Sequence, residues 1–440
     1  MDISIFSRGI KVKTKSQTGS IKRVTSPARA VVLLRQCASC ECDTTVEKGA
    51  KVMAGQMIAR AKDSDGADLH SPVSGQIDDF EDVVLTDGSK CRAVVIKSDG
   101  KDTPEKSIKV NDDLISTLKA AGIVVTGRDG STLAKVLTEA RRDYGHDVTT
   151  GKPIVRRVDH LVVRCCDVDP HLKTQKIVTE RLDDLLGLAK SIAALVKLTS
   201  PSAVHFVLDK NQQAAKLEKY ADEMDYAVHR VDASRYPMAA NPFLAKKVSG
   251  KEPSLLFHGS NLSGTIVLDI ATVLELAATL ETGVPVVEKT ITVVGPKETV
   301  VCKVRVGTSL AEIVEAVGMA GDYDKVIIEG PLGGSAVHTL DYPVTKNMSG
   351  LTLIPKGSVD PFENEPCTSC GLCTMVCPTR LVPGMLSRYC EYGQFEQAEN
   401  AHLFNCIECG CCAYVCPAGR SMVQFMVLGK SELIAARRVS

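Results

Sequence analysis

Between residues 101 and 285, short apolar runs alternate with longer segments in which apolar residues recur at helical spacing. The predicted strands cover residues 158–165, 203–208, 226–231 and 265–268, and the predicted helices cover residues 114–122, 132–142, 174–198, 211–224 and 271–280. Strands that alternate with helices pair in parallel, because each crossover helix returns the chain to the same end of the sheet. The pattern predicts an α/β domain with a mostly parallel sheet and helices on both faces.

A different pattern precedes it, in which short β-type runs are broken by Gly and Asp over residues 28–100. Residues 46–59 and 69–77 resemble the two halves of a lipoyl-type barrel-sandwich hybrid. Carriers of that class present a modifiable lysine at a hairpin tip, whereas Lys62 stands at the start of the connecting stretch. We therefore interpret this region as a structural β-domain.

Residues 286–354 predict a second, smaller β-rich domain. Residues 289–294 and 299–304 form a predicted hairpin with Gly295 and Pro296 at its turn. Residues 307–318 predict a helix in which Thr308 or Ser309 is the N-cap. This combination indicates a β-grasp-like domain.

The C-terminal region, residues 355–440, carries two cysteine runs, CTSCGLCTMVCP and CIECGCCAYVCP. Both have the C-x2-C-x2-C-x3-C-P spacing that holds [4Fe-4S] clusters, and in two-cluster ferredoxins the fourth Cys of each run binds the other cluster. The predicted ligands of one cluster are Cys367, Cys370, Cys373 and Cys416, and those of the other are Cys406, Cys409, Cys412 and Cys377. Disulfides or zinc are the alternatives, and two complete copies of the run make both improbable. Cys411 and Cys390 lie off the spacing and are interpreted as spare.

Three further cysteines, Cys37, Cys40 and Cys42, are crowded into the sequence CASCEC. Thiols this close could bind a metal or sense redox state. No fourth ligand follows at a convincing spacing, unless Cys91 or a histidine folds back.

Residues 1–27 are polar and rich in Lys, Ser and Thr, which predicts an N-terminal arm of low order. They lack the apolar core of a signal peptide, and no apolar run in the chain approaches the roughly 18 residues of a membrane span.

The charges balance, with 53 Lys and Arg against 53 Asp and Glu, so the net charge gives no sign of a nucleic-acid partner. Seventeen cysteines, eight of them in cluster runs, favour a reducing compartment. We expect a cytoplasmic protein, or one on the cytoplasmic face of a membrane.

The order of these regions resembles the RnfC family, one of the subunits of the Rnf ion-translocating electron-transport complex, over nearly the whole chain. The motifs that carry the resemblance are HSPVSG at 70–75, AGIV at 121–124, DVDP at 167–170, ITVVG with VGTSLAEIVEAVG at 291–295 and 306–318, GP at 330–331, PVTKNMSG at 343–350 and CIECGCCAYVCP at 406–417. The resemblance implies an α/β multidomain protein with a barrel-sandwich β-domain, an α/β nucleotide-binding-like domain, a β-grasp-like domain and a ferredoxin-type two-cluster module.

Members of this family usually bind FMN and NADH in the α/β domain, and this chain departs from their pattern. Where the family has a glycine-rich flavin loop, only Gly127 and Gly130 remain, and Arg128 and Asp129 stand between them. Bulky or acidic side chains at these positions oppose the close approach of backbone N–H groups to a phosphate.

The family's acidic motif is kept in shortened form as Asp167 and Asp169, and its asparagine is replaced by Arg164. The resemblance therefore implies Gly127, Gly130, Asp167 and Asp169 as candidate flavin and NADH residues. Two interpretations stay open. The fold persists around a vestigial nucleotide site, with the two aspartates as helix caps, or a modified site holds FMN with Arg128 or Arg164 paired to its phosphate.

We expect an iron–sulfur subunit that relays electrons through two [4Fe-4S] clusters in a membrane-associated complex of the Rnf type. Its expected partners are the other subunits, with a ferredoxin or similar carrier upstream, and its expected place is the cytoplasmic face of the cell membrane. The alternatives are an FMN-dependent NADH:acceptor oxidoreductase subunit and a soluble partner that feeds electrons to a reductase.

Overall fold

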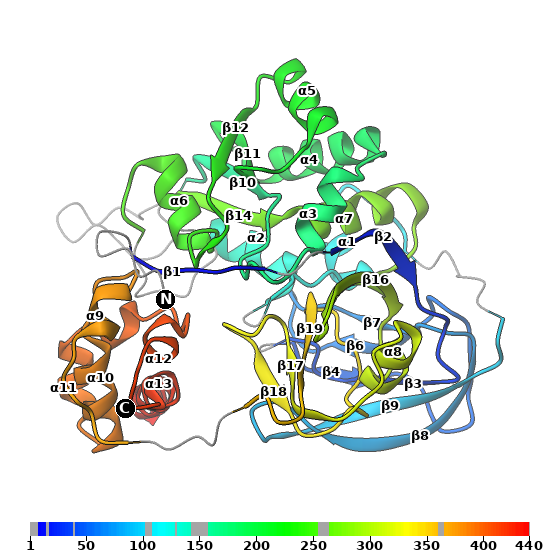
Figure 1. Ribbon diagram of the computed structural model, residues 1–440. Coiled ribbons are helices and arrows are strands. Elements are labelled where there is room, and N and C mark those ends of the chain that lie inside the picture. Colours follow the sequence, from blue (N-terminus) through cyan, green and yellow to red (C-terminus); the bar gives the residue numbers. More distant parts are fainter. Residues whose placement is uncertain are drawn as a thin grey trace.

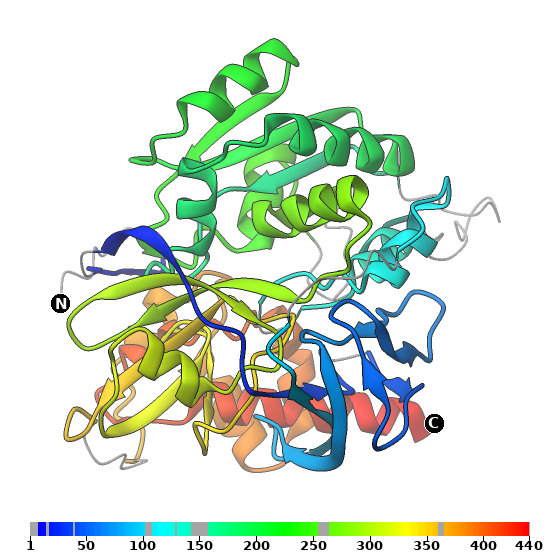
Figure 2. The ribbon, with the colours of Figure 1, turned by 90° about the vertical axis from the view of Figure 1, so that its right-hand side faces the viewer.

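The computed structural model describes residues 8–14, 17–37, 40–101, 108–127, 130–141, 157–253, 264–359 and 365–439. Three groups of elements are visible in Figure 1: a parallel sheet with its helices at the top, two β-rich regions side by side at lower right, and a helical module at lower left. Turned by 90°, the parallel sheet and its helices still lie above the β-rich regions (Figure 2). Within the described part of the chain, no helix is long and apolar enough to cross a bilayer.

The predicted parallel sheet is confirmed. Its four strands, all parallel, lie in the order β12 (Ala227–Val231), β11 (Ala203–Asp209), β10 (His160–Arg164) and β14 (Thr265–Asp269). Side chains alternate across it: Leu161 and Val163 face one core, and Val162 faces another. The first core is covered by α4 (Leu185–Thr199), α5 (Ala215–Glu223) and α7 (Ile270–Thr282), and the second by α6 (Asn241–Ser249). Both faces are thus buried, as the continuous apolar runs required.

The single helix predicted over residues 174–198 is wrong. The segment forms two helices, α3 (Thr174–Glu180) and α4. The Asp184 side chain accepts a hydrogen bond from the N–H of Gly187 at 2.7 Å and so starts α4 as its N-cap. A capping residue inside an apolar periodic run therefore divided one helix into two.

The β-domain consists of two sheets around one apolar core. The first contains β3 (Arg29–Leu33), β9 (Lys90–Ser98), β8 (Gly75–Val84) and β5 (Lys51–Val52), and the second contains β4 (Cys42–Thr44), β6 (Met57–Ala61) and β7 (Leu69–His70). A Cβ on Gly75 would lie 2.0 Å from the Lys97 carbonyl oxygen, so the last residue of HSPVSG must be glycine for β8 to approach β9. Lys62 is exposed and lies 3.2 Å from Glu41, in a surface ion pair.

The third sheet has six strands and includes the predicted hairpin. They lie in the order β18 (Ser335–Val337), β17 (Tyr323–Ile328), β19 (Gly350–Pro355), β15 (Glu288–Val294), β16 (Thr299–Arg305) and β2 (Gln17–Arg23). The helix α8 (Leu310–Ala316) packs on this sheet, and Ser309 is its N-cap in a capping box with Glu312.

The N-terminal arm is ordered where it is described, so the prediction of low order is wrong for that part. The strand β2 pairs in parallel with β16, and β1 (Ile10–Lys11) pairs with β13 (Arg235–Tyr236). Its polar side chains suit an edge strand, whose backbone rather than its side chains makes the long-range contacts. Polar composition thus concealed a β-strand.

The helical module follows the third sheet. Its helices are α9 (Leu372–Val376), α10 (Pro383–Glu391), α11 (Phe395–Asn400), the 3-10 helix η1 (Leu403–Asn405), α12 (Cys411–Tyr414) and α13 (Met422–Val439). The arm also reaches this module, because the N–H of Gly9 donates to the carbonyl of Val376 at 2.9 Å.

One buried lysine joins three regions of the molecule. The Nζ of Lys346, which is fully buried, donates to the carbonyl oxygens of Gly122 at 2.9 Å and Asp68 at 3.3 Å. Gly122 ends α1 (Leu114–Ala121), which leads towards α2 (Leu133–Arg141), and Asp68 belongs to the β-domain. Burial lowers the pKa of Lys346 to about 8, so the ammonium keeps its charge at neutral pH only because these acceptors compensate for lost water.

Gly122 supplies a direct test of this joint. A Cβ there would lie 2.2 Å from the Asp68 carbonyl oxygen and 2.3 Å from Lys346 Nζ, at a φ of +66°. Gly122→Ala should lower the free energy of unfolding by about 3 kcal/mol, from left-handed strain plus overpacking. Gly250 ends α6 at a φ of +70° with no atom within 4 Å of a Cβ, so Gly250→Ala should cost only about 1 kcal/mol. Urea unfolding followed by circular dichroism measures both, and equal losses would contradict the joint.

Candidate functional site

The two cysteine runs adopt the same local structure. A residue with a φ of +56° follows two positions after each first cysteine, Ser369 in one run and Glu408 in the other. Its N–H donates to the sulfur of that cysteine, at 3.4 Å to Cys367 and 3.3 Å to Cys406. Gly371 and Gly410, with φ of +77° and +78°, then begin α9 and α12. The duplication seen in the sequence is therefore a duplication in backbone geometry, with N–H groups directed at sulfur.

Four cysteines surround a small cavity of about 20 Å³ in this module. Its wall combines Cys406, Cys409 and Cys412 of the second run with Cys377 of the first. The same wall contains Pro378, Leu381 and Met426, so the sulfurs meet in an apolar setting. This is the set in which sequence spacing placed the exchanged fourth cysteine.

The other four predicted ligands lie nearer the surface. Cys367 and Cys370 are exposed, and Cys373 and Cys416 are partly buried against the core of the module. A Cβ on Gly384, at the start of α10, would come within 3.4 Å of the Cys373 sulfur. Among the described residues, no three His, Cys, Asp or Glu side chains converge closely enough for a single metal ion. That spacing disfavours zinc, whereas a cubane, whose four irons each take one thiolate, holds its ligands further apart.

A buried ion pair lies directly beside the second run. Lys430, on α13, donates to the Cys406 carbonyl oxygen at 2.6 Å and to Glu408 Oε1 at 2.7 Å. Burial raises the pKa of the Cys406 thiol to about 12, and the Lys430 ammonium acts in the opposite direction. Without a metal the thiol form is favoured here, so binding of a metal must release protons.

The two spare cysteines have structural surroundings. Cys411 is fully buried and its thiol lies 3.8 Å from the carbonyl oxygen of Tyr236, in the α/β domain. Cys390 is buried on α10, where a Cβ on Gly429 would lie 2.4 Å from its sulfur. Neither sulfur lines the cavity of the second run.

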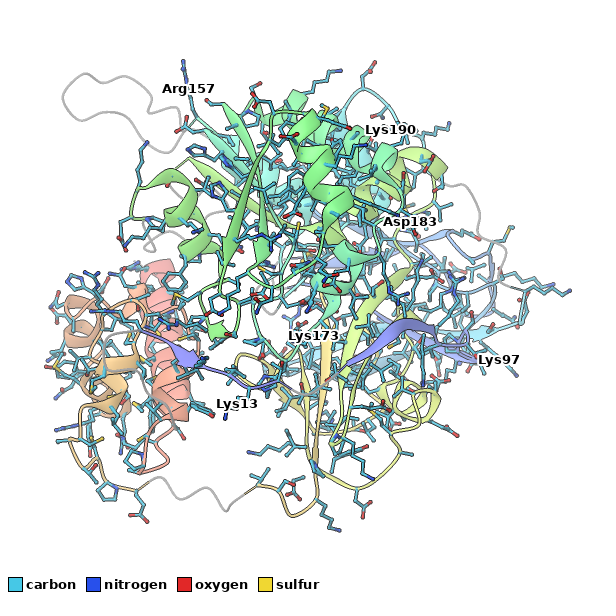
Figure 3. The ribbon with its side chains drawn as sticks, turned by 45° about the horizontal axis from the view of Figure 1, so that its top comes forward. Lys13, Lys97, Arg157, Lys173, Asp183 and Lys190 are labelled. Atoms are coloured by element: carbon cyan, nitrogen blue, oxygen red, sulfur yellow. A yellow bond between two sulfur atoms is a disulfide. The ribbon has the colours of Figure 1, made fainter. Side chains whose placement is uncertain are left out.

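The nucleotide candidates lie at and near the carboxyl edge of the parallel sheet. Its strand order places the first two connections on one side of β10 and returns on the other, so the crevice between β10 and β14 is the position where such sheets bind ligands. Asp167 and Asp169 directly follow β10 at this edge. Nearby Lys173 lies between the α/β region and the third sheet (Figure 3), where its N–H donates to Thr292 Oγ1 at 2.9 Å.

Both aspartates are engaged by the protein itself. Asp167 accepts hydrogen bonds from the N–H groups of Gln175 and Lys176, in the first turn of α3, at 3.1 and 3.2 Å. Burial raises the pKa of Asp167, and these two donors oppose the rise. Asp169 accepts from the N–H groups of His171 and Leu332, each at 3.0 Å. The helix-capping interpretation is thus correct for Asp167, while Asp169 ties two loops together.

The loop between Gly127 and Gly130 offers few donors to a phosphate. The N–H of Gly127 donates to the carbonyl of Asn347 at 2.8 Å, and that of Gly130 donates to the carbonyl of Gly127 at 2.9 Å. Arg128 and Asp129 lie outside the described residues. The four implied flavin and NADH residues therefore do not fit a phosphate cradle, because their polar groups already have partners within the protein.

Arg164 ends β10 and is directed elsewhere. Its Nη1 donates to Asn241 Oδ1, at the start of α6, at 2.7 Å. Its Nε is buried and has no partner among the residues described. It therefore fixes α6 against the sheet and keeps one donor available.

Sequence reasoning missed Glu329, a buried acid just before the GP motif. It has a φ of +72° and accepts hydrogen bonds from the N–H of Ser349, at 2.8 Å, and from the Ser349 hydroxyl. Burial raises its pKa to about 7. GP and the SG of PVTKNMSG mark the family in the sequence, and that they flank one buried carboxyl group was the available signal.

Glu329 predicts a pH-dependent stability. Since its pKa rises from 4.5 to about 7 on folding, the folded state keeps the proton longer, and stability should fall as pH rises between these values, by on the order of 3 kcal/mol at most. Glu329→Gln retains an acceptor for Ser349 and should flatten the profile, whereas Glu396→Gln, on an exposed face, should leave it unchanged. Urea midpoints measured from pH 4.5 to 8 decide, and identical slopes for wild type and Glu329→Gln would refute the assignment.

Residues 5–101 match the family model of the RnfC barrel sandwich hybrid domain. The chain is 27% identical over 423 residues to the C subunit of the proton-translocating ferredoxin:NAD(+) oxidoreductase complex of Clostridium ljungdahlii, covering 93% of this chain and 89% of that protein. It is also 27% identical over 427 residues to the C subunit of the ion-translocating oxidoreductase complex of Methanosarcina acetivorans, covering 93% of each.

Among solved structures, an NAD+-reducing [NiFe]-hydrogenase in the H2-reduced state has a TM-score of 0.47 and 15% identity, covering 77% of this chain and 68% of that one. The two-sheet β-domain accordingly carries the RnfC barrel sandwich hybrid, and the resemblance of the whole chain to the RnfC family of ion-translocating oxidoreductase complexes, expected from its motifs, is confirmed.

Proposed function

We propose that this chain is the iron–sulfur electron-transfer subunit of an Rnf-type ion-translocating oxidoreductase complex. The observation that carries the proposal is the exchange of Cys377 into the wall formed by Cys406, Cys409 and Cys412. An exchanged fourth cysteine is the arrangement that two adjacent cubanes require. The names of the relatives, subunits of ferredoxin:NAD(+) and ion-translocating oxidoreductase complexes, support the same role.

Two [4Fe-4S] clusters would supply one-electron transfer and no bond chemistry. Cys406, Cys409, Cys412 and Cys377 would hold one, and Cys367, Cys370, Cys373 and Cys416 the other. The protein's own contribution is electrostatic. The N–H groups of Ser369 and Glu408 point at the sulfurs of Cys367 and Cys406, where they stabilise negative charge.

The two clusters would differ in their surroundings. The Cys406 set lies in an apolar wall beside the Lys430–Glu408 pair, whereas Cys367 and Cys370 are exposed. Solvent exposure and nearby charge set the reduction potential of such clusters. The exposed cluster would exchange electrons with a partner, a ferredoxin or similar carrier, and the buried one would pass them on.

The remaining features of the assignment follow from this role. The other subunits of the complex would be its partners, and the chain would lie peripherally on the cytoplasmic face of the membrane. Its division into an arm (1–27), a barrel-sandwich domain (28–100), an α/β domain (101–285), a β-grasp-like domain (286–354) and a two-cluster module (355–440) is part of the same proposal.

We also propose that this chain does not bind FMN in the loop that the family uses. The N–H groups of Gly127 and Gly130 and the carboxylates of Asp167 and Asp169 have protein partners, as described above. An FMN-dependent NADH:acceptor oxidoreductase is therefore the weaker candidate. A soluble electron-feeding subunit uses the same clusters and differs only in its partners.

The cluster assignment predicts the effect of single cysteine changes. Anaerobically purified wild type should contain about eight iron atoms per chain, and Cys412→Ser or Cys373→Ser about four, because each removes a ligand of one cluster. Cys411→Ser is the matched control, since its buried neighbouring thiol contacts Tyr236 instead, and it should keep about eight. Iron and sulfide analysis with electron paramagnetic resonance makes the measurement. Loss of a cluster in Cys411→Ser but not in Cys412→Ser would reject the ligand sets.

The flavin proposal predicts that FMN does not bind stoichiometrically and that NADH does not bleach the cluster absorbance. Flavin fluorescence titration of the cluster-loaded protein measures the first, and anaerobic visible spectroscopy the second. The double variant Arg128→Gly with Asp129→Ala should improve FMN binding, because it removes a side chain and a like charge from the loop. Tight FMN binding by wild type would restore the enzyme interpretation.

A further inference from the structure

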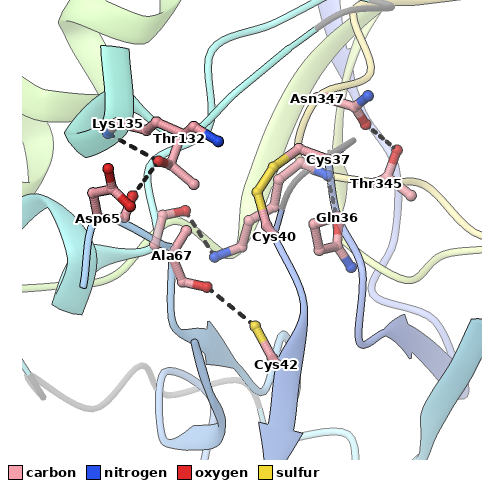
Figure 4. The surroundings of a disulfide bond; sticks show 12 residues. Gln36, Cys37, Cys40, Cys42, Asp65, Ala67, Thr132, Lys135, Thr345 and Asn347 are labelled. Atoms are coloured by element: carbon pink, nitrogen blue, oxygen red, sulfur yellow. Dashed lines mark hydrogen bonds between the residues drawn. A yellow bond between two sulfur atoms is a disulfide. The ribbon is translucent and has the colours of Figure 1, made fainter. Parts of the chain in front are cut away.

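Cys37 and Cys40 form a disulfide at the boundary between the β-domain and the α/β domain (Figure 4). The other fifteen of the seventeen cysteines, all of them in the described part of the chain, are thiols. The bond closes a loop between residues only three positions apart. Such a short loop restricts the unfolded chain least, so this disulfide adds little to stability. A role in stabilising the fold therefore explains it poorly.

The pair is held in an apolar setting on one side. Cys37 and Cys40 share a small core with Ala67 and Val124. Cys42, the third thiol of the sequence CASCEC, is turned away and donates to the carbonyl of Ala67 at 3.4 Å. Burial raises the pKa of Cys42 to about 12, so it is not a thiolate that competes for the bond. Two of the three sulfurs are thus paired and the third is separate.

On the other side, Cys37 lines a cavity of about 240 Å³ between the β-domain and the third sheet. Of the cysteines in the described part of the chain, Cys37 alone belongs to its wall. The volume is several times the roughly 30 Å³ of a water molecule, enough for the thiol-bearing end of a ligand. The two sulfurs are therefore unequal, with Cys37 at the cavity and Cys40 behind it.

The wall around Cys37 is polar and firmly held. Arg35 places a guanidinium group in it, paired with Asp87 at 3.3 Å, and a cation near a sulfur favours thiolate. Gln36 is fixed at both ends, since its Nε2 donates to the Leu33 carbonyl and its Oε1 accepts from the N–H of Lys346. The backbone next to Cys37 is therefore anchored to the buried lysine joint.

We propose that Cys37 and Cys40 form a redox-active pair that exchanges with an external dithiol, entering through this cavity, with Cys37 as the attacked sulfur and Cys40 as the resolving one. A thiolate of the dithiol attacks Cys37, the Cys37–Cys40 bond breaks, and Cys40 leaves as a thiolate that takes up a proton. The second thiol of the ligand then attacks its own sulfur in the mixed disulfide and releases Cys37. Two electrons and two protons pass from the dithiol to the pair, and the ligand becomes a disulfide.

This exchange uses no iron and does not depend on the proposed electron-transfer function. Iron content measured in the same samples separates the two, because loss of clusters would leave the state of the pair unchanged. The redox state can be read from one peptide. Trypsin releases residues 36–48, which contain Cys37, Cys40 and Cys42, so alkylation adds one label to the oxidised form and three to the reduced form.

The first experiment equilibrates full-length protein with mixtures of dihydrolipoamide and lipoamide under argon, followed by acid quenching and mass spectrometry of this peptide. We expect one label to change to three in a two-electron transition. Reduced thioredoxin, tested in parallel, distinguishes a small-molecule dithiol from a protein dithiol. A peptide that phosphine reduces but neither dithiol reduces would overturn the proposal, as would three labels at every ratio.

The second experiment tests the inequality of the two sulfurs. Cys40→Ala leaves Cys37 at the cavity and should capture lipoamide as a mixed disulfide about tenfold faster than Cys37→Ala captures it at Cys40. Cys42→Ala is the matched control and should keep the wild-type transition between oxidised and reduced pair. Circular dichroism verifies that each variant is folded. Equal capture rates in folded Cys37→Ala and Cys40→Ala would overturn the assignment, and if either variant fails to fold, the wild-type titration still decides whether the pair exchanges.

Discussion

The charge of one lysine holds the arrangement of the domains together. Lys346 is buried where the β-domain, the end of α1 and the third sheet meet, and its ammonium group is compensated by backbone carbonyls of Asp68 and Gly122. Backbone acceptors have fixed positions, so the lysine is satisfied only when all three regions are in place. Nearby, the buried Lys289 pairs with Glu275 at 2.5 Å between β15 and α7. These polar contacts specify the relative orientation of domains that apolar packing alone would leave less defined.

Local signals predicted the elements well, and long-range ones predicted the contacts poorly. Periodicity located the four parallel strands, because each is buried on both faces and therefore continuously apolar. The glycine after α1 and the capping box at Ser309 and Glu312 could likewise be read from neighbouring residues. The arm was misjudged, since β2 is held by hydrogen bonds to a strand some 280 positions away, which its own polar composition does not reveal.

The candidate sites divide in the same way. Cysteine spacing alone placed Cys377 with the second run, because a cluster imposes a fixed local geometry on its ligands. The nucleotide residues were chosen by family motif, and their side chains and N–H groups turn out to be engaged with α3, Leu332 and Asn347. A motif gives residue types but not the partners they find after folding. Glu329 and Lys346 escaped notice for the same reason, since burial of a charge depends on segments that meet only in the tertiary structure.

The N-terminal arm has a consequence for how the chain is made. Gln17 pairs with Thr299, and Gly9 bonds to Val376, so the arm leaves the ribosome long before the segments to which it binds. At usual rates of synthesis this delay is roughly 15 to 60 s. For that time the arm has no partner, and the third sheet stays open at β16. Closure of the arm is thus a late step, and it links the timing of β-sheet assembly to the appearance of the cysteine module.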